Sequence, residues 1–323
     1  MDSFFVVPVL ELVYILAKVH MIWFITVEGI IMHNIFGNIS YKSNELMSGH
    51  TTFRIGGPAK YFFTPETDDE IVKIIDICKA HNIRYLIMGN GSNMLFSDQG
   101  FDGAIIQIYN NYNLIDVQED GIYANAGALL SKLAALAREN SMTGMEFAAG
   151  IPGTLGGAVV MNAGAYGGEM KDIIEYVDVL ESDGTVKRYN CENMEFGYRK
   201  SIISDDKIVL GAKLRLAKGD KTLIQAKMDE LKIARTSKQP LELPSAGSTF
   251  KRPEGYFAAK LIDDSGLRGY KSGGAMVSEK HCGFVVNYDK ATCKDVLEVI
   301  EHVQDVVEEK YGVRLEPEVK IIL

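Results

Sequence analysis

The sequence has few cysteines and no surplus of positive charge. Its four cysteines, at positions 78, 191, 282 and 293, form no C-x-x-C pair and no disulfide spacing, as expected in a reducing cytoplasm. The net charge of −9 argues against binding nucleic acid, which needs a basic surface. No metal site is expected, because His281 has no companions at metal-ligand spacing, and we interpret it as a structural residue or as one that supports the residues of a site.

The sequence also lacks an uninterrupted apolar run near its start. The stretch from Phe4 to Ile31 is mostly apolar. Four titratable residues interrupt it: Glu11, Lys18, His20 and Glu28. A membrane helix needs about 20 mostly apolar residues, and a central charge costs roughly 2.5–3.5 kcal/mol. A signal peptide's basic start and cleavage site are absent too. Two interpretations stay open, a poor membrane anchor or an extension before a functional start at Met32. We favour the extension and expect no stable membrane insertion.

The common nucleotide-binding fingerprints are absent from the segment richest in glycine. Between Gly144 and Gly168, eight of 25 residues are glycine and Glu146 is the one charged residue. Its glycines lack the G-x-G-x-x-G spacing, and no G-K-[ST] follows, which excludes Rossmann and Walker sites. Such a loop can present backbone N–H groups to phosphate oxygens. A run of tight turns at strand ends is the alternative.

Two further segments carry glycine at turns. Ile83–Met88 is expected to be a short buried strand that runs into GNGSNMLFSD, residues 89–98, whose small polar residues suit a pyrophosphate. The segment His50–Pro65 is expected to form two strands around a tight turn at Gly56-Gly57-Pro58.

Apolar periodicity and caps predict the remaining elements. Thr67 and Glu70 form an expected capping box for a helix that buries Cys78. The expected strands are Ala104–Ile108, Leu114–Gln118, Ile122–Ala126, and a hairpin of Tyr176–Leu180 with Val186–Tyr189. The expected further helices are Leu129–Asn140, Lys221–Lys238 as a bridge to the C-terminal domain, and one from near Thr292 that stops at Gly312.

Two polar segments carry candidate chemistry. By spacing alone, the Tyr-Arg-Lys cluster of FGYRKSII (196–203) is typical of a solvated surface. The loop PSAGSTFKRPEG (244–255) contains no G-x-S-x-G and no Ser–His–Asp arrangement is evident, so a hydrolase nucleophile is not expected.

The segment GIPGTLGGAVVMNAGAYGGE, residues 150–169, resembles the UDP-N-acetylenolpyruvoylglucosamine reductases, bacterial flavoenzymes of cell-wall synthesis. The resemblance extends over about residues 40 to 322 through TTFRIGGPA, GNGSN, a Y-R-x-S segment and SAGS. Cys282 stands where alanine is common, Lys320 where arginine is common, and Leu323 where the family's final motif ends in glycine.

The resemblance implies an α+β fold, with an FAD-binding domain of the para-cresol-methylhydroxylase type, built from two pieces, and a C-terminal α+β substrate-binding domain. The expected organisation is an extension (1–31), a first FAD-binding piece (32–110), a second FAD-binding piece (111–217) and the C-terminal domain (218–323). The 49 positions between Arg199 and Ser248 are similar to the family's shorter type, which lacks a tyrosine-bearing loop.

The resemblance also implies the site residues. The catalytic residues would be Arg199, Ser248 and Glu318. The FAD-binding residues would be Arg54, Gly56, Gly57, Gly89, Asn90, Gly91, Ser92, Asn93, Gly150, Ile151, Pro152, Gly153, Thr154, Gly156 and Gly157. The substrate-binding residues would be Tyr198, Lys251, Lys260 and Lys271.

The implied activity is NADPH-dependent reduction of UDP-N-acetyl-3-O-(1-carboxyvinyl)-glucosamine (UDP-N-acetylglucosamine enolpyruvate) to UDP-N-acetylmuramate, a cytoplasmic peptidoglycan precursor. FAD would be bound non-covalently, because the 144–168 segment has no His or Cys to tether it. A related flavin oxidase that uses oxygen and a non-catalytic nucleotide-binding or membrane-associated protein are the alternatives. The sequence carries no signal for oligomeric state.

Overall fold

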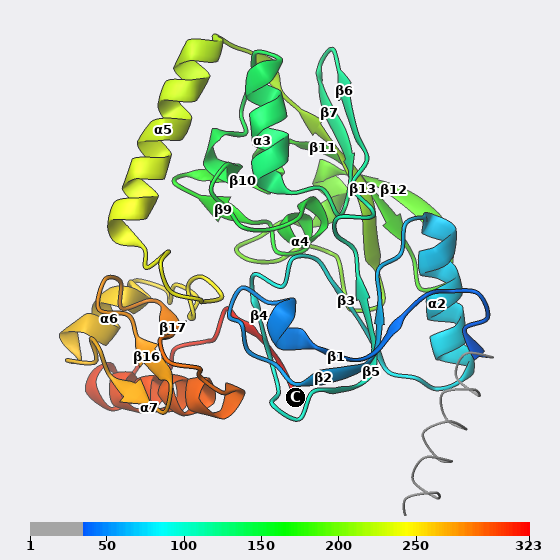
Figure 1. The fold of residues 1–323 in the computed structure, drawn as a ribbon. Coiled ribbons are helices and arrows are strands. Elements are labelled where there is room, and N and C mark those ends of the chain that lie inside the picture. Colours follow the sequence, from blue (N-terminus) through cyan, green and yellow to red (C-terminus); the bar gives the residue numbers. More distant parts are fainter. Residues whose placement is uncertain (1–34) are drawn as a thin grey trace, which may run out of the picture.

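The computed structural model describes residues 35–323 (Figure 1). The predicted 1–31 extension lies outside these residues. The first strands of this portion form a four-stranded sheet. The strands β1 (Lys42–Leu46), β2 (Pro58–Phe63), β5 (Phe101–Gln107) and β3 (Tyr85–Met88) lie in that order. β1 pairs antiparallel with β2, and the other two pairings are parallel.

The helix α2 (Asp68–Ala80) follows β2 and buries the predicted face of Ile71, Ile74, Ile75 and Cys78. The Thr67 side chain caps it by accepting from the Glu70 N–H. The predicted capping box is half wrong, because Glu70 accepts from the Glu66 N–H, one residue before the cap. Burial raises the pKa of the Cys78 thiol to about 11, which confirms a core residue rather than a redox thiol.

The prediction of a strand over the first portion of His50–Pro65 is wrong. The backbone turns there, with Arg54 N–H donating to Thr51 O and Thr51 Oγ1 donating to Ile55 O. Phe53 and Ile55 are buried in the C-terminal hydrophobic cluster instead of a sheet. Long-range packing therefore overrides the local strand pattern.

A second sheet of five antiparallel strands follows: β6 (Ile115–Gln118), β7 (Gly121–Asn125), β11 (Ile174–Leu180), β12 (Val186–Asn190) and β13 (Ile208–Arg215), in the order β12-β11-β13-β7-β6. The predicted hairpin is confirmed as β11 and β12. The helices α3 (Leu130–Glu139) and α4 (Leu155–Val160) contact β7. Two short pairs complete this region: β9 (Gly164–Ala165) with β10 (Gly168–Glu169), and β8 (Met142–Thr143) with β14 (Ala217–Lys218).

The helix α5 (Lys221–Lys238) has the predicted bounds and leads into the C-terminal region, at the lower left of Figure 1. That region contains α6 (Ala258–Asp264), the small sheet β15 (Lys271–Ser272), β16 (Ala275–Val277) and β17 (Val285–Asn287), and α7 (Cys293–Tyr311). Thr292 caps α7 and Gly312 ends it at φ 67°, both as predicted. Among the described residues, no helix is long and apolar enough to cross a membrane.

The last strand returns to the first half of the chain. β18 (Lys320–Ile322) pairs in parallel with β4 (Met94–Phe96), which directly follows the Gly89–Asn93 loop. This pairing brings Glu318 beside that loop, where Asn93 Nδ2 donates to its carbonyl oxygen at 3.0 Å. The predicted domain boundaries stay a prediction.

Candidate active site

The three predicted catalytic residues line one cavity of about 380 Å³, which we call the Arg199 cavity. Arg199 follows the second sheet's strand β12, Ser248 lies between α5 and α6, and Glu318 comes just before β18. Three segments far apart in the sequence therefore meet at one site.

A tight turn presents Arg199. The turn is closed by two backbone hydrogen bonds between Gly197 and Lys200, which leaves Tyr198 and Arg199 at its tip. Arg199 has φ 56°, a left-handed conformation that is uncommon outside glycine and is concentrated at functional sites. Its Nε donates to Glu318 Oε1 at 2.9 Å.

Two hydrogen bonds to its backbone hold Glu318 in place. Its N–H donates to Thr249 O at 2.8 Å, and its carbonyl accepts from Asn93. Burial raises the pKa of this carboxyl above its ordinary value of 4.5, and the positive charges of Arg199 and Lys251 oppose that change without cancelling it. The site thus favours the protonated form more than water does.

The loop around Ser248 is fixed by its neighbour Thr249. The Thr249 N–H donates to Gly283 O at 2.8 Å, and its Oγ1 accepts from the Val285 N–H at 2.9 Å. Within residues 35–323 the Ser248 hydroxyl makes no hydrogen bond to another side chain or to the backbone. It is therefore available to a ligand in the cavity.

The two glycine-containing loops contact each other. Asn90 Nδ2 donates to Pro152 O at 2.8 Å. A Cβ at Gly89 would lie 2.3 Å from Thr154 Oγ1, so the Gly89 backbone lies close enough to the Thr154 side chain to require glycine. The two predicted FAD loops thus form one continuous wall.

That wall borders two cavities. Ser92, Asn93, Ile151 and Pro152 line the Arg199 cavity. A second cavity of about 360 Å³, the Gly89 cavity, is lined by four other predicted residues: Gly89, Thr154, Gly156 and Gly157. Small residues and backbone N–H groups along two cavities on the same pair of loops fit an elongated dinucleotide such as FAD, with its phosphates beside the loops.

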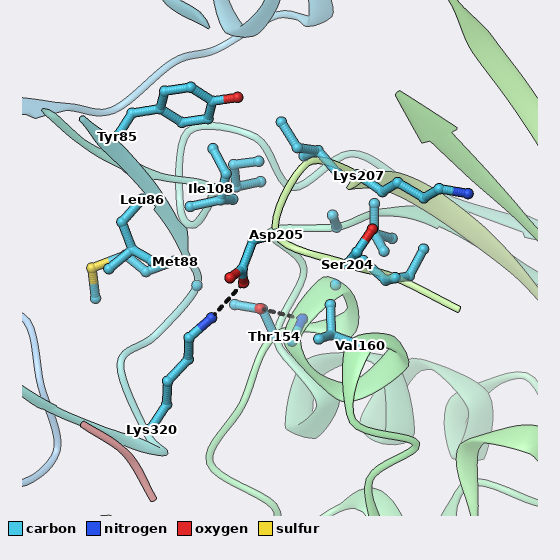
Figure 2. Close-up of a pocket in the computed structure, with 18 of the residues that line it drawn as sticks. Tyr85, Leu86, Met88, Ile108, Thr154, Val160, Ser204, Asp205, Lys207 and Lys320 are labelled. Atoms are coloured by element: carbon cyan, nitrogen blue, oxygen red, sulfur yellow. Dashed lines mark hydrogen bonds and ion pairs between the residues drawn. The ribbon is translucent and has the colours of Figure 1, made fainter. Parts of the chain in front are cut away.

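Figure 2 shows the Gly89 cavity between β3, α4 and the loop before β13. Lys320 Nζ reaches across it to Asp205 Oδ1 at 2.8 Å. Tyr85 and Leu86 line this cavity and are half-buried. The short strand predicted over Ile83–Met88 is confirmed as β3 (Tyr85–Met88), but its predicted burial holds for Met88 and not for the three residues before it, which are half-buried beside the cavity.

Three glycines predicted to bind FAD, Gly56, Gly57 and Gly91, lie where neighbouring atoms leave no room for a side chain. A Cβ would lie 2.2 Å from Asp98 O at Gly57, 2.2 Å from His50 O at Gly91, and 2.8 Å from Met47 Cβ at Gly56. None of the three lines the Arg199 or Gly89 cavity. Their contacts with FAD stay predictions, as does that of Gly153, whose added Cβ would lie 3.6 Å from Ser92 Oγ.

The predicted substrate residues lie in two places. Tyr198 is exposed beside Arg199, and its hydroxyl accepts from the Arg252 N–H at 3.0 Å. Lys251 forms an ion pair with Glu316, two residues from Glu318. Lys260 pairs with Asp264 at 2.8 Å on α6, and Lys271 lies over the Tyr288 ring at 4.4 Å. Neither Lys260 nor Lys271 lines the Arg199 cavity.

Sequence reasoning did not single out four residues that line the Arg199 cavity, Tyr166, Arg235, Lys238 and Phe284, and His281, which also lines it, was not predicted to bind a ligand. Arg235 and Lys238 lie one turn apart at the end of α5, in a charge-rich stretch that looks like a solvated helix. Burial lowers the pKa of the His281 imidazole, and its Nδ1 accepts from the Gly283 N–H at 3.2 Å. The neutral ring is thereby fixed in one orientation.

The comparisons with known proteins agree with this geometry. Residues 59–190 match the FAD binding domain family, and residues 239–322 match the family described as UDP-N-acetylenolpyruvoylglucosamine reductase, C-terminal domain. The reductase of Clostridioides difficile (strain 630) is 49% identical over 290 residues, covering 90% of this chain and 95% of that protein. The reductase of Lachnoclostridium phytofermentans is 51% identical over 296 residues, covering 90% and 96%. The crystal structure of the Thermus caldophilus reductase covers 88% of this chain and 100% of its own, with a TM-score of 0.78 and 36% identity.

Fold and site define an FAD-binding oxidoreductase of the α+β class, which confirms the predicted fold class. The first two sheets carry the FAD-binding match, and α6, α7 and their small sheet carry the second match. The chain belongs to the UDP-N-acetylenolpyruvoylglucosamine reductase family.

Proposed function

We propose that this protein reduces UDP-N-acetyl-3-O-(1-carboxyvinyl)-glucosamine to UDP-N-acetylmuramate, with NADPH as the electron donor and non-covalent FAD. The observation that carries the proposal is the meeting of Arg199, Ser248 and Glu318 in one cavity beside the two FAD loops. Relatives about 50% identical over most of their length bear the reductase name. The substrate and NADPH are cytoplasmic compounds, so we infer that the protein works there.

When bound, FAD supplies the two-electron chemistry that carries hydride to the vinyl carbon of the substrate. The residues named above would hold it: the backbone of Gly89–Asn93 and Gly150–Gly157 at its phosphates. The protein's own task is then to orient the enolpyruvyl group and to manage the charge that develops on it.

Arg199 stabilises the negative charge of the substrate. Hydride addition to an α,β-unsaturated carboxylate pushes electrons into the carboxylate and gives an enolate-like dianion. Arg199 donates from Nε to Glu318 and from Nη1 to Gly164 O at 3.5 Å, which leaves Nη2 for the carboxylate, and guanidinium stays charged at any working pH. Removing one comparable donor in other enzymes costs roughly 2.7–4 kcal/mol of transition-state stabilisation.

Glu318 acts in its protonated form. An ionised carboxylate beside a developing dianion would repel it, whereas a carboxylic acid donates a hydrogen bond to it. The burial that raises the pKa of Glu318 favours this form. When no substrate is bound, the positive charge of Arg199 stabilises the ionised form of Glu318.

Ser248 supplies the proton. The α-carbon of the dianion is a strong base, so a serine hydroxyl can protonate it although its own acidity is weak. Because the Ser248 hydroxyl has no partner within the described portion of the chain, it can turn toward the substrate.

The experiment that tests the proposal is an anaerobic turnover. The FAD-loaded protein is mixed with NADPH and the enolpyruvyl substrate, and the product is identified by mass spectrometry as the substrate plus two hydrogens. If NADPH reduces the flavin, the enolpyruvyl substrate does not reoxidise it, and admitting oxygen afterwards does, the proposal would be overturned in favour of a flavin oxidase. Absence of any flavin reduction would favour the non-catalytic alternative.

A further inference from the structure

A third cavity adjoins the Arg199 cavity and has no role in the chemistry above. It has a volume of about 380 Å³, and we call it the Arg54 cavity after one of its lining residues. The two cavities share Pro152, Arg235 and Phe284 as a common wall. A ligand seated in the Arg199 cavity could therefore extend into its neighbour.

Two guanidinium groups line the Arg54 cavity, those of Arg54 and Arg235. Over residues 35–323, no carboxylate lies within ion-pair distance of either one. The carboxylate in the cavity wall, Glu242, already pairs with Lys280 at 3.5 Å. The cavity thus holds two positive charges without a protein counter-ion, in a chain whose net charge is −9.

Packing fixes the position of Arg235. Its Nη1 donates to Gly150 O, and a Cβ at Gly150 would lie 3.0 Å from its Nε. Burial lowers the pKa of this guanidinium from 12.5, with Tyr166 opposing that change, and the group stays charged at neutral pH. A desolvated cation that has hydrogen-bond partners but no carboxylate counter-ion is unfavourable, and a bound anion would offset that cost.

Arg54 is fixed by its backbone. Its N–H closes the turn to Thr51 O, and its φ is 56°, a conformation of limited stability for a residue other than glycine. Its side chain is exposed at the cavity and makes no hydrogen bond or ion pair within the described residues. It is accessible to an incoming anion.

We propose that the Arg54 cavity binds a phosphate monoester, namely the 2′-phosphate of NADPH, and so discriminates NADPH from NADH. The inference rests on the proposed function, in which NADPH is the donor. A phosphate monoester carries a charge of about −1.5 to −2 at pH 7, and guanidinium is the side-chain group best suited to bind its oxygens. FAD and the UDP-sugar contain diphosphates but no monoester. The donor is therefore the one ligand of the proposed reaction that has this group.

The test compares the two nicotinamide donors. Anaerobic stopped-flow gives the dissociation constant of NADPH and of NADH in the flavin-reduction step of the FAD-loaded enzyme. Arg54→Met should reduce the preference for NADPH over NADH by about 10- to 100-fold, the effect of losing a charged hydrogen bond. Arg54→Lys should retain some of the preference. Lys132→Met, which removes an exposed cation from α3, should leave it unchanged.

A second measurement uses fragments as probes. By isothermal titration calorimetry on the FAD-loaded enzyme, 2′,5′-ADP should bind more tightly than 5′-ADP, and Arg54→Met should abolish the difference. Equal binding of the two probes by the wild type, an unchanged donor preference in Arg54→Met, or loss of FAD from that variant would overturn the inference. Failure of the proposed function is distinguishable, because the enolpyruvyl substrate would then not reoxidise the reduced wild-type enzyme, whatever the donor preference.

Discussion

Arg199 Nε and Glu318 Oε1 lie 2.9 Å apart in the cavity, although 119 positions separate the two residues in the sequence. Their side chains are 21% and 10% exposed. The pair joins the loop between β12 and β13 to the segment before β18, and so connects the FAD-binding region to the end of the chain. Burial raises the pKa of the Glu318 carboxyl, and the positive charge of Arg199 opposes that change.

The stability of the protein should depend on the titration of Glu318. Burial raises the pKa of Glu318 in the folded state above its unfolded value, so the folded state holds the proton more tightly. Its contribution to stability is therefore fully present below pH 4.5 and is lost as the pH rises through the folded pKa, with a slope of at most about 1.4 kcal/mol per pH unit. Glu318→Gln cannot titrate and should lack this slope.

Urea denaturation of both proteins between pH 4 and about 8 measures the effect. The free energy of unfolding of the wild type, relative to Glu318→Gln, should decrease with rising pH. Glu316→Gln, an exposed neighbour, should follow the wild type. A relative stability that increases with pH would mean that Arg199 outweighs burial in setting the pKa of Glu318.

FAD should leave the protein without breaking a covalent bond. The loops Gly89–Asn93 and Gly150–Gly157 contain no His or Cys to tether it. Precipitation with acid should therefore release the yellow chromophore into the supernatant. Colour that stays in the pellet would contradict this, and His281, which lines the Arg199 cavity, would be the first residue to examine.

Gly89→Ala should weaken FAD binding. The new Cβ would lie 2.3 Å from Thr154 Oγ1, and Thr154 cannot turn away without losing its cap on the Gly157 N–H. Overpacking of this kind costs about 1–3 kcal/mol, or roughly a 5- to 150-fold higher dissociation constant. Fluorescence titration of the FAD-free protein measures it. Gly49→Ala, with no atom within 4 Å of the new Cβ, is the control, and equal affinities in the two variants would remove the loop contact from the account.

Elements with local signals could be predicted from the sequence. The bounds of α5 and α7 agree because their caps are encoded next to them, as at Thr292 and Gly312. The turn at His50–Ile55 could not be predicted in this way. Phe53 and Ile55 look like strand residues, but they pack against a cluster that the chain forms some 200 residues later.

The candidate site shows the same limit. No periodicity joins Arg199 to Glu318, and the Tyr-Arg-Lys cluster alone favoured a solvated surface for Arg199. The expectation that these residues act together came from the family resemblance, and the structure places both at one cavity. Arg235 was missed because it lies on a charge-rich helix, and its cavity forms only when the Gly150 loop packs against it. The surroundings of Arg199 and of Arg235 form only through tertiary contacts, which the local sequence does not encode.

The most direct test of the account is the separate measurement of the two half-reactions in Ser248→Ala. This change deletes one oxygen and leaves the charge of the cavity unaltered. Stopped-flow absorbance at the flavin band should show that reduction by NADPH proceeds as in the wild type. Oxidation by the enolpyruvyl substrate should be slower by about 10²–10⁴-fold, as expected when a general acid is lost. Ser237→Ala, whose exposed hydroxyl bonds only within α5, should match the wild type in both steps. Equal slowing of both half-reactions, or no slowing of either, would contradict the role of Ser248 as the proton donor.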